Sequence, residues 1–256
     1  MSELLVCRGL GKMFGGIQAL ANVEFSIDAG EIYGLIGPNG AGKTTLFNLL
    51  TGIYVPDAGS MLFEGRQLAG LKSHEIVRHG VARTFQNIRL FANLSALENV
   101  MIGRHARTRA GVLGAVLRNA ATRREESEIE ARALELLEFV GLHERANSAA
   151  GNLSYGDQRR LEIARALATE PRLLALDEPA AGMNASETQS LRVLLGNIRA
   201  RGITLLLIEH DMRLVMSLCD RILVLDHGEK IAENVPAAVQ NDARVIEAYL
   251  GAPAET

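Results

Sequence analysis

Unbroken apolar runs of strand length recur along the chain and predict buried β-strands. They cover residues 31–36, 173–176, 204–208 and 221–225. Such runs are typical of strands that are covered on both faces, which is the situation in parallel sheets. Longer stretches with helical character lie at 43–51, 187–200 and 236–250. We therefore predict an α/β fold built on a mainly parallel sheet.

Two other regions have a different pattern. The first 30 residues and residues 59–68 contain more glycine and more polar alternation, which indicates a smaller antiparallel β subdomain. Residues 94–169 show no convincing strand, and 124–140 has the composition and the i, i+3, i+4 apolar spacing of a helix that Gly141 ends. We predict a single domain over 1–256, in which residues 88–165 form an α-helical subdomain inserted into a core of 1–87 and 166–256.

Composition narrows the class of protein. The chain has 256 residues, of which 48% are hydrophobic and 22% charged, so it can bury a full core and is not a disordered protein. A net charge of −3 argues against electrostatic capture of nucleic acid. Aromatic residues make up 4% of the chain and tryptophan is absent, which argues against a platform for stacking bases. We expect no nucleic-acid partner.

Cysteine content and apolar runs bear on the cellular compartment. The two cysteines, Cys7 and Cys219, are too few for a disulfide framework and are expected to be reduced core thiols. The first ten residues lack the basic-then-apolar pattern of a signal peptide. No apolar run approaches the roughly 20 residues that span a bilayer. We expect a soluble protein, or one that is attached to a membrane through a partner.

A glycine-rich segment follows the first predicted core strand and opens the first core helix. It fits the pattern G-x-x-x-x-G-K-[ST], which is typical of phosphate-binding loops (P-loops). Its glycines allow backbone N–H groups to approach phosphates, and the helix adds its positive end. Lys43 would place a charge on the β- and γ-phosphates, and Thr44 would offer its hydroxyl to Mg²⁺. We assign nucleotide binding to Gly37, Pro38, Asn39, Gly40, Ala41, Gly42, Lys43, Thr44 and Thr45.

Two adjacent acids end the apolar run at 173–176. A carboxylate at the end of a core strand would lie beside the P-loop, where the metal binds. Asp177 is therefore the candidate metal ligand, and Glu178 is placed to orient and polarise an attacking water. A helix cap or a salt-bridged acid pair is the alternative for these two residues.

Further motifs, in their order along the chain, resemble those of the ATP-binding subunits of ABC transporters. The segment Leu153-Ser-Tyr-Gly-Asp-Gln158 resembles the signature of that family. Gln86, in Arg-Thr-Phe-Gln-Asn, resembles the Q-loop glutamine, and His210, in Ile-Glu-His-Asp, resembles the switch histidine. Phe14 resembles the aromatic residue that stacks on adenine. The resemblance covers nearly the whole chain and implies a P-loop NTPase core of the ABC type.

The resemblance implies a role for each of these residues, with ATP and Mg²⁺ as cofactors. Gln86 would ligate Mg²⁺ and take part in hydrolysis, and His210 would hold the γ-phosphate and the water. Ser154 and Gly156 would contact the ATP held by an opposite subunit, so that two subunits sandwich two ATP molecules. A core or edge aromatic, a surface-loop glutamine and a structural histidine are the alternatives for Phe14, Gln86 and His210.

Closer features resemble one branch of the family, the branched-chain amino acid importers. They are the segments 83–91, 98–102 and 247–251. Within that branch the chain resembles the kind of ATPase subunit with the longer helical lobe. The implied partners are a second ABC ATPase subunit, identical or different, two integral membrane permease subunits and, indirectly, a periplasmic substrate-binding protein. The implied location is peripheral, on the cytoplasmic face of the bacterial inner membrane.

Three positions depart from the family pattern. Tyr155 replaces the first glycine of the general signature, although it suits this branch. Asp157 stands where glutamine is commoner, and with Ser154 it would complete a capping box. Asn184 replaces the usual aspartate in the loop after Glu178, a loop that bridges the dimer in the family.

An acid-free stretch from Asn99 to Arg124 is a further candidate for function. It holds an apolar run at 112–117 and six arginines: Arg104, Arg107, Arg109, Arg118, Arg123 and Arg124. One interpretation is a solvated basic face. The other is contact with anionic lipid head groups or with a membrane subunit.

Other classes of P-loop protein compete with a transport ATPase. A soluble ABC-type ATPase of assembly or repair would share every nucleotide motif, and only the branch features favour transport. A P-loop kinase has no need of the segment 153–158. A regulatory GTPase normally carries Asn-Lys-x-Asp, which this chain lacks.

Overall fold

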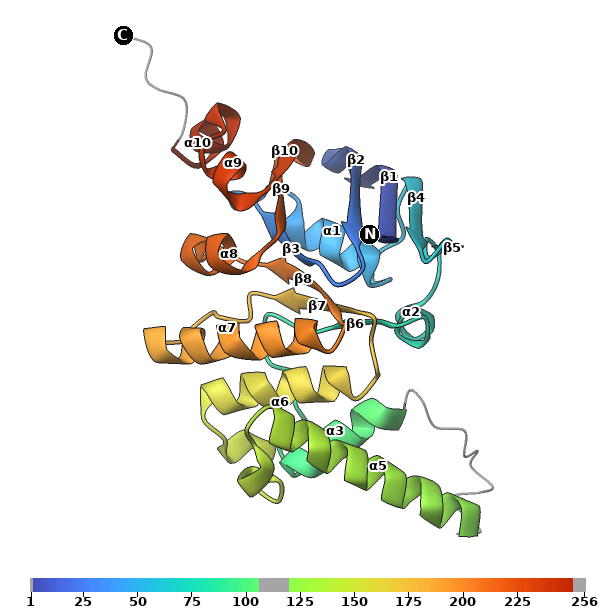
Figure 1. Ribbon diagram of the computed structural model, residues 1–256. Coiled ribbons are helices and arrows are strands. Elements are labelled where there is room, and N and C mark those ends of the chain that lie inside the picture. The colour runs from blue at the N-terminus through green and yellow to red at the C-terminus, as the bar shows by residue number, and fades with distance from the viewer. Residues whose placement is uncertain (1, 106–119, 251–256) are drawn as a thin grey trace. The chain divides into compact units, whose positions relative to one another are not determined.

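The computed structural model describes residues 2–105 and 120–250, which form two compact units (Figure 1). Unit 1 comprises Met1–Ile76 and Ala175–Thr256, and unit 2 comprises Val77–Leu174. The chain therefore leaves unit 1, builds unit 2 and returns. The short helix α2 (Ser73–Arg78) and the strand β7 (Leu173–Asp177) are the elements in which these two crossings occur.

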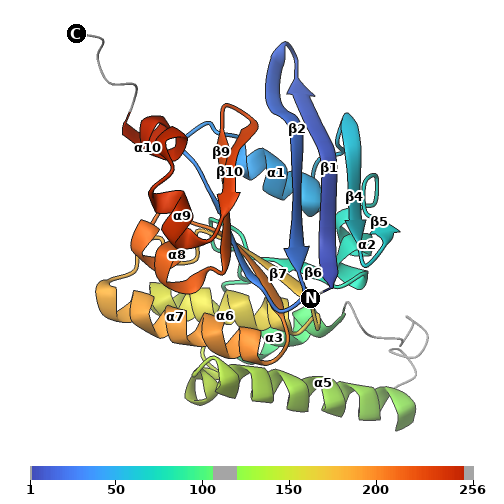
Figure 2. The ribbon, with the colours of Figure 1, turned by 45° about the horizontal axis from the view of Figure 1, so that its top comes forward.

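An antiparallel sheet opens unit 1, with the strand order β2-β1-β4-β5 (Figure 2). Its strands are β1 (Glu3–Phe14), β2 (Ile17–Asp28), β4 (Ala58–Phe63) and β5 (Arg66–Gln67). Along β1, the buried residues Leu5, Cys7 and Leu10 alternate with more exposed ones, as expected for a sheet with one covered face. The predicted antiparallel β subdomain is confirmed.

The second sheet of unit 1 has the strand order β10-β9-β3-β8-β7. Its strands are β3 (Ile32–Ile36), β8 (Thr204–Ile208), β9 (Arg221–Asp226), β10 (Glu229–Asn234) and the unit 1 part of β7. β3 runs parallel to both of its neighbours, β8 and β9, and all of its residues are buried. All the predicted apolar runs are strands here. β10 pairs antiparallel at the edge, and the sequence did not reveal it because its residues are mostly polar.

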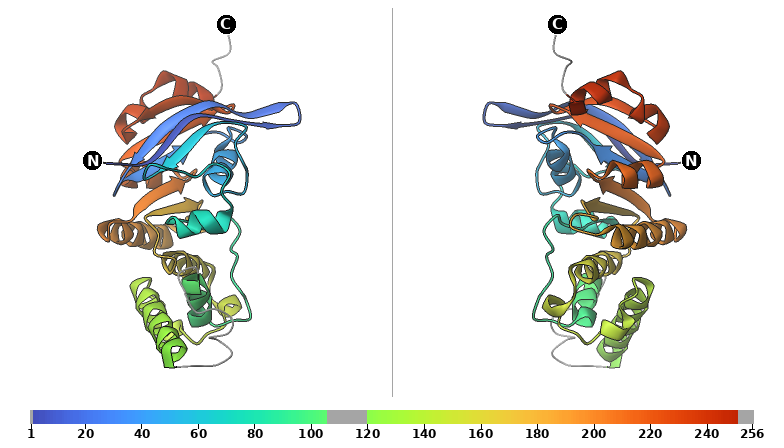
Figure 3. Two further views of the ribbon diagram at one scale, coloured as in Figure 1. Left: turned by 90° about the vertical axis from the view of Figure 1, so that its right-hand side faces the viewer. Right: turned by 90° about the vertical axis from the view of Figure 1, so that its left-hand side faces the viewer.

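The helices of unit 1 are α1 (Lys43–Leu50), α7 (Ala185–Ala200), α8 (Met212–Leu218), α9 (Pro236–Gln240) and α10 (Ala243–Leu250). α1 packs against the long strand β2 (Figure 3). The predicted single helix over 236–250 is wrong, because the chain breaks between α9 and α10. Asn241 donates from its side chain to the carbonyl of Ala237, and Asp242 accepts the backbone N–H of Arg244. These local bonds replace helical ones.

Unit 2 is mainly helical. It contains β6 (Val81–Arg83), α3 (Ala96–Arg104), α5 (Ala120–Phe139), α6 (Tyr155–Leu167) and the 3₁₀ turns η2 (His143–Arg145) and η3 (Ala150–Asn152). α3 packs against both α5 and α6. Gly103 makes the second contact possible, since a Cβ there would lie 2.2 Å from the carbonyl oxygen of Arg165. Gly141, with φ +78°, follows α5 where the sequence predicts its end.

The acid-free stretch of the sequence is only partly described. Residues 106–119, with three of its arginines and the apolar run, lie outside the described residues. Arg104 lies inside them and forms an ion pair of 2.5 Å with Glu170. None of the helices in the described part of the chain combines the length and the apolar character that crossing a membrane requires.

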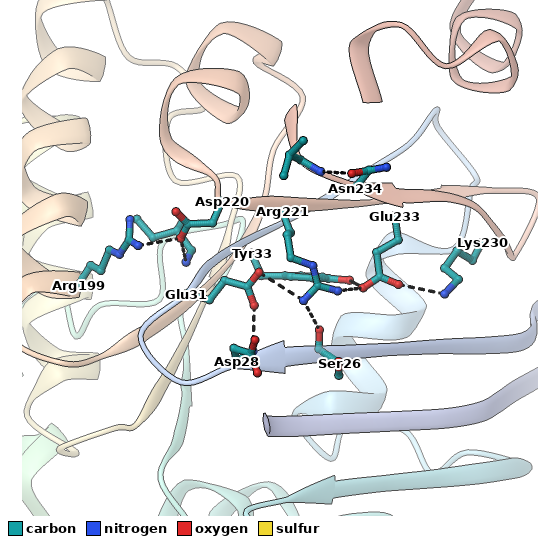
Figure 4. A network of polar contacts seen from close by, with 12 residues as sticks. Ser26, Asp28, Glu31, Tyr33, Arg199, Asp220, Arg221, Lys230, Glu233 and Asn234 are labelled. Carbon is teal, nitrogen blue, oxygen red and sulfur yellow. Dashed lines mark hydrogen bonds and ion pairs between the residues drawn. The ribbon is translucent and has the colours of Figure 1, made fainter. Parts of the chain in front are cut away.

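A polar network joins the two sheets of unit 1 (Figure 4). The guanidinium of Arg221, on β9, contacts the carbonyl of Ser26 and the carboxylates of Glu31 and Glu233. It also lies 5.4 Å from the ring centroid of Tyr33, whose hydroxyl donates to Glu233 over 2.8 Å. Burial raises the pKa of Glu31, and the guanidinium of Arg221 opposes that shift. One cation therefore serves two carboxylates from different elements.

We predict that Arg221→Met lowers the free energy of unfolding by about 3 kcal/mol, because it leaves the buried carboxylate of Glu31 without its cation, whereas Glu233 keeps Lys230 at 2.9 Å. Arg221→Lys, the matched control, keeps the charge but not the planar fork, and we expect it to cost about 1.5 kcal/mol. Glu31 binds protons more readily in the folded state, so the deficit of the Met variant shrinks as the pH is lowered toward the ordinary carboxyl value of 4.5. Denaturant unfolding at several pH values measures these differences, and equal stability of the Met variant and the parent would contradict the role of Arg221.

Candidate functional site

The predicted P-loop connects β3 to α1 in a conformation that requires glycine. Gly37 has φ +150°, and a Cβ there would lie 2.1 Å from the carbonyl oxygen of Leu225 on β9. Gly42 has φ +99°, and a Cβ there would lie 2.7 Å from the carbonyl oxygen of Ala19 on β2. A side chain at either position would therefore clash with backbone in a conformation that L-residues rarely adopt.

The turn between β9 and β10 holds this loop in place. The backbone N–H of Gly228 donates to the carbonyl of Ala41 over 3.0 Å, and the N–H of Ala21 donates to the carbonyl of Gly228 over 2.8 Å. The loop is thus tied through one turn to strand β2. Asn39, Gly40 and Thr44 are exposed, whereas Thr45 is half-buried in the first turn of α1.

Lys43 folds over the P-loop. Its Nζ donates to the carbonyl oxygens of Gly37 and Pro38 over 2.6 and 2.8 Å. Burial lowers the pKa of Lys43, and the nearby carboxylate of Glu178 opposes that shift. No side chain caps the first turn of α1, whose N-cap is Gly42. The amides of that turn and the ammonium of Lys43 are therefore the donors available for an anion.

The two predicted acids lie at the carboxyl end of β7. Asp177 is buried, with 6% of its surface exposed. Glu178 has φ +48°, a backbone conformation that is uncommon for a residue other than glycine and that stores strain at functional sites. Its N–H donates to the carbonyl of Ile208 at the end of β8 over 2.9 Å. The ends of β7 and β8 therefore fix the position of the Glu178 backbone.

His210 lies close to Glu178. The distance from Nδ1 of His210 to Oε2 of Glu178 is 3.8 Å, and the imidazole is 68% exposed. The structure thus brings together Lys43, Glu178 and His210 from three segments that are far apart in the sequence. An ammonium, a carboxylate and an imidazole around a P-loop match the needs of phosphoryl chemistry.

Phe14 ends β1 near the tip of the β1–β2 hairpin. Its ring is 42% exposed and meets the ring of Tyr54 edge to face, with centroids 5.1 Å apart. Nζ of Lys12 lies 5.4 Å from the centroid of Phe14. The ring is therefore supported from two sides and still presents surface for stacking, so it is not a core aromatic.

The signature segment lies in unit 2 and begins α6. Ser154 is the N-cap residue, and its Oγ accepts the backbone N–H of Asp157 over 3.2 Å. Among the contacts found for this helix, only that half of the predicted capping box is formed. The complete boxes at Ser95 and Asn184 both use a glutamate at the third position, which is one methylene longer than aspartate. Gly156 is buried in the first turn, and Tyr155 is exposed.

Gln86 is also in unit 2, where charged residues of α6 hold its backbone. Arg159 donates to the carbonyl of Phe85 over 2.6 Å and to that of Gln86, and Glu162 accepts the N–H of Phe85 over 3.2 Å. Arg159 and Glu162 are themselves paired at 3.2 Å and nearly fully buried. Burial raises the pKa of Glu162, and the Phe85 N–H and then the charge of Arg159 oppose that shift. Sequence reasoning missed this pair, although its i, i+3 spacing was visible.

Two further findings concern residues near the site. Asn184 is the N-cap of α7 and forms a complete capping box with Glu187, so the departure from aspartate keeps a capping residue. Burial raises the pKa of Tyr249 on α10, and the backbone N–H of Gly37 in the P-loop opposes that shift. The sequence showed Tyr249 only as part of a branch feature, not as a neighbour of the P-loop.

Two oxygen donors of unit 1, Thr44 and Asp177, suit a hard divalent cation. The third predicted ligand, Gln86, belongs to unit 2. Within the described residues, no group of three or more His, Cys, Asp or Glu side chains could hold a metal by itself. Mg²⁺ is commonly bound by one or two protein oxygens together with substrate phosphates and water, and this donor set fits such a site.

Comparison with protein families gives two matches. The ABC transporter family matches residues 20–181, and the family described as branched-chain amino acid ATP-binding cassette transporter matches residues 229–255. The first match contains the P-loop, the signature segment and both acids, and the second covers β10, α9 and α10.

Individual proteins are similar over nearly the whole chain. The high-affinity branched-chain amino acid transport ATP-binding protein LivG of Salmonella typhimurium is 48% identical over 249 residues, which cover 97% of this chain and 98% of that protein. The protein of the same description from Pseudomonas aeruginosa, BraF, is 46% identical with the same coverage.

Solved structures of ATP-binding cassettes are also similar. MJ1267, an ATP-binding cassette of an ABC transporter in its ADP conformation, has a TM-score of 0.86 and 33% identity, covering 98% of this chain and 100% of its own. The cassette MJ0796, solved as a dimer in a post-hydrolysis state with ADP and Pi, has a TM-score of 0.76 and 27% identity, covering 91% and 98%.

We predict that Glu162→Gln loosens the segment around Phe85 and Gln86, because it leaves the buried guanidinium of Arg159 without its carboxylate. Amide hydrogen exchange at Phe85 should rise at least about tenfold, and the free energy of unfolding should fall by about 3 kcal/mol. Arg160→Gln, on the next position of the same helix, is the control and should leave exchange at Phe85 unchanged. Unaltered exchange in Glu162→Gln would show that this pair does not hold the segment.

Proposed function

This chain belongs to the ABC transporter family of ATP-binding proteins, and on that basis we propose that it hydrolyses ATP as a subunit of a branched-chain amino acid importer. The support is the close similarity to LivG and BraF over nearly the whole chain, together with the match of the C-terminal residues to the branched-chain family. We further propose that 1–256 is one ABC domain, with residues 88–165 as its helical subdomain.

One observation in the structure carries the hydrolytic activity. The uncapped first turn of α1 and the ammonium of Lys43 form an anion site, and the carboxylate of Glu178 and the imidazole of His210 lie beside it. A triphosphate bound there would replace the carbonyls of Gly37 and Pro38 as the partners of Lys43. Its γ-phosphorus would then be next to a carboxylate that can accept hydrogen bonds from water.

Hydrolysis proceeds by in-line attack of water on the γ-phosphorus, and positioning with charge neutralisation does most of the work. Glu178 orients the attacking water and polarises it. His210 donates a hydrogen bond to the γ-phosphate and keeps the water in line, and its exposed imidazole leaves room for both contacts. Lys43 neutralises charge on the β- and γ-phosphates, and Phe14 stacks on adenine.

The oxygens of Thr44, Asp177 and Gln86 are the proposed ligands of Mg²⁺. When bound, the ion would screen the negative charge of the phosphates. Asp177 suits this role because it is buried at the end of a core strand, where a cation compensates the cost of burying its charge. The hydroxyl of Thr44 is on the exposed face of the same helix turn that binds the phosphates.

A second ABC ATPase subunit, identical or different, completes each nucleotide site. Ser154 and Gly156 lie at the start of α6, whose N-terminal amides suit a phosphate. They belong to unit 2, whereas the P-loop belongs to unit 1. We propose that they bind the γ-phosphate of the partner's ATP, and the dimer of the similar cassette MJ0796 supports such pairing.

The remaining partners follow from the importer assignment. They are two integral membrane permease subunits and, through these, a periplasmic substrate-binding protein. The chain would be peripheral, on the cytoplasmic face of the bacterial inner membrane. A soluble ABC ATPase of assembly or repair is not favoured, because the similarity to transport subunits extends to both ends of the sequence.

We predict that Glu178→Gln binds ATP as tightly as the parent but slows turnover by at least about 100-fold, because the amide cannot accept a proton or polarise water in the same way. Steady-state phosphate release and equilibrium binding of ATP test the two parts. Glu229→Gln, at the exposed start of β10, is the control and should retain full activity. Near-normal hydrolysis by Glu178→Gln would remove Glu178 from the mechanism.

We also predict that ATP converts Glu178→Gln into a stable pair with a partner ATPase subunit, while Ser154→Arg in the same background prevents pairing. Size-exclusion chromatography with light scattering measures the association, using ADP as the control nucleotide. Affinity purification of the full chain from membranes should also recover integral membrane subunits. A nucleotide-bound chain that neither pairs nor recovers such subunits would contradict the importer assignment.

A further inference from the structure

Glu209 is a buried carboxylate that the proposed mechanism does not use. It follows the last residue of β8 and directly precedes His210, and only 1% of its surface is exposed. A buried carboxylate is costly unless its oxygens accept enough hydrogen bonds. The partners of Glu209 therefore indicate what it stabilises.

Those partners come from two different loops. Oε1 of Glu209 accepts the backbone N–H of Ala180 over 2.8 Å, and Oε2 accepts the N–H of His210 over 3.2 Å. The backbone N–H of Asp211 also lowers the pKa of the same carboxylate. Ala180 is two residues beyond Glu178. One side chain therefore links the loop that follows the water-orienting glutamate to the loop that carries the histidine.

Backbone bonds and a helix cap fix the ends of these loops. Glu178 itself is fixed at its start by the bond from its N–H to the carbonyl of Ile208. Asp211 caps α8 by accepting the N–H of Arg213 over 2.9 Å and of Leu214 over 3.3 Å. The backbone of His210 thus lies between a capped helix and Glu209, while its imidazole is largely exposed and makes the 3.8 Å approach to Glu178.

We propose that Glu209 is a positioning residue for ATP hydrolysis, which sets the distance between Glu178 and His210 by binding the backbone of both of their loops. This inference rests on the proposed function and goes beyond it, because the proposed mechanism gives Glu209 no contact with nucleotide or with the attacking water. It acts through His210 and through the loop at Ala180.

The backbone donors around Glu209 explain why this position holds an acid rather than an amide. Two backbone N–H groups, those of Ala180 and His210, donate to different oxygens of this carboxylate, and a carboxylate has only acceptor oxygens to offer them. Glutamine has the same shape but turns an NH₂ group toward at least one N–H, so it cannot hold both loops. Burial raises the pKa of Glu209, and the bonds from Ala180, Asp211 and His210 oppose that shift, as expected if these bonds retain the charge.

The test compares Glu209→Gln, His210→Ala and the double variant in the full-length chain. Glu209→Gln should lower kcat about tenfold and change the KM for ATP less than about twofold. Because part of the effect of Glu209 passes through His210, the loss of kcat in the double variant should be smaller than the product of the two single losses. Amide exchange at Ala180 and His210 should rise together in Glu209→Gln.

A matched control separates positioning from general stability. Glu31→Gln alters another buried carboxylate of unit 1, which accepts the N–H of Asp28 over 2.9 Å in the network of Figure 4. Glu31 precedes the amino end of β3, whereas Ala180 and His210 follow the carboxyl ends of β7 and β8, and β3 runs parallel to β8. It should lower stability but leave kcat unchanged. If Glu209→Gln does not fold, Glu209→Asp keeps the charge on a shorter side chain and should show the same loss of kcat at unchanged KM.

The outcomes distinguish this inference from the proposed function. An active parent with a kcat of Glu209→Gln within about twofold of it would overturn the inference alone. So would losses that multiply in the double variant, or a raised KM at unchanged kcat. A parent chain that hydrolyses no ATP would overturn both.

Discussion

The interaction on which the site depends is that of Lys43 with the backbone of its own loop. A half-buried ammonium needs acceptors, and here it takes the carbonyls of Gly37 and Pro38. That geometry exists only because glycine at positions 37 and 42 lets β9 and β2 approach the loop closely. The ammonium of Lys43 is therefore held over the loop, and the carboxylate of Glu178 lies close enough to favour its charged form.

Glu178 and His210 show how the core sheet supplies that placement. Glu178 directly follows β7 and His210 follows β8 after Glu209, and all residues of both strands are buried. The two strand ends are joined by the bond from the N–H of Glu178 to the carbonyl of Ile208. The positive φ of Glu178 turns the chain sharply after Asp177, so these adjacent acids are available for different proposed roles. Strain of this kind persists only where surrounding bonds hold it. The bonds from Ala180 and His210 to Glu209 are of that type.

The sequence predicted those parts of the fold and site that local chemistry determines. Unbroken apolar runs identified the core strands, and the spacing of glycine, lysine and threonine identified the P-loop. The sequence did not predict the edge strand β10, because most of its residues are polar. It also did not predict the break between α9 and α10, where Asn241 and Asp242 bond to nearby backbone. The bond from Phe85 to Glu162 spans 77 positions, and that from Ala180 to Glu209 spans 29. Pairings of this length follow from tertiary structure and leave no periodic signal.

One departure from the family pattern is explained by hydrogen bonds to the backbone. Asn184 accepts two backbone N–H groups at the start of α7, as aspartate would, and loses only the charge interaction with the helix dipole, worth about 0.3–1 kcal/mol. In unit 2, Arg159 and Glu162 tie the backbone of Gln86 to the helix that begins at Ser154. A movement of Gln86 on loss of the γ-phosphate would therefore carry the signature segment with it. In the proposed dimer, Gln86 and the segment proposed to bind the partner's ATP would then move together.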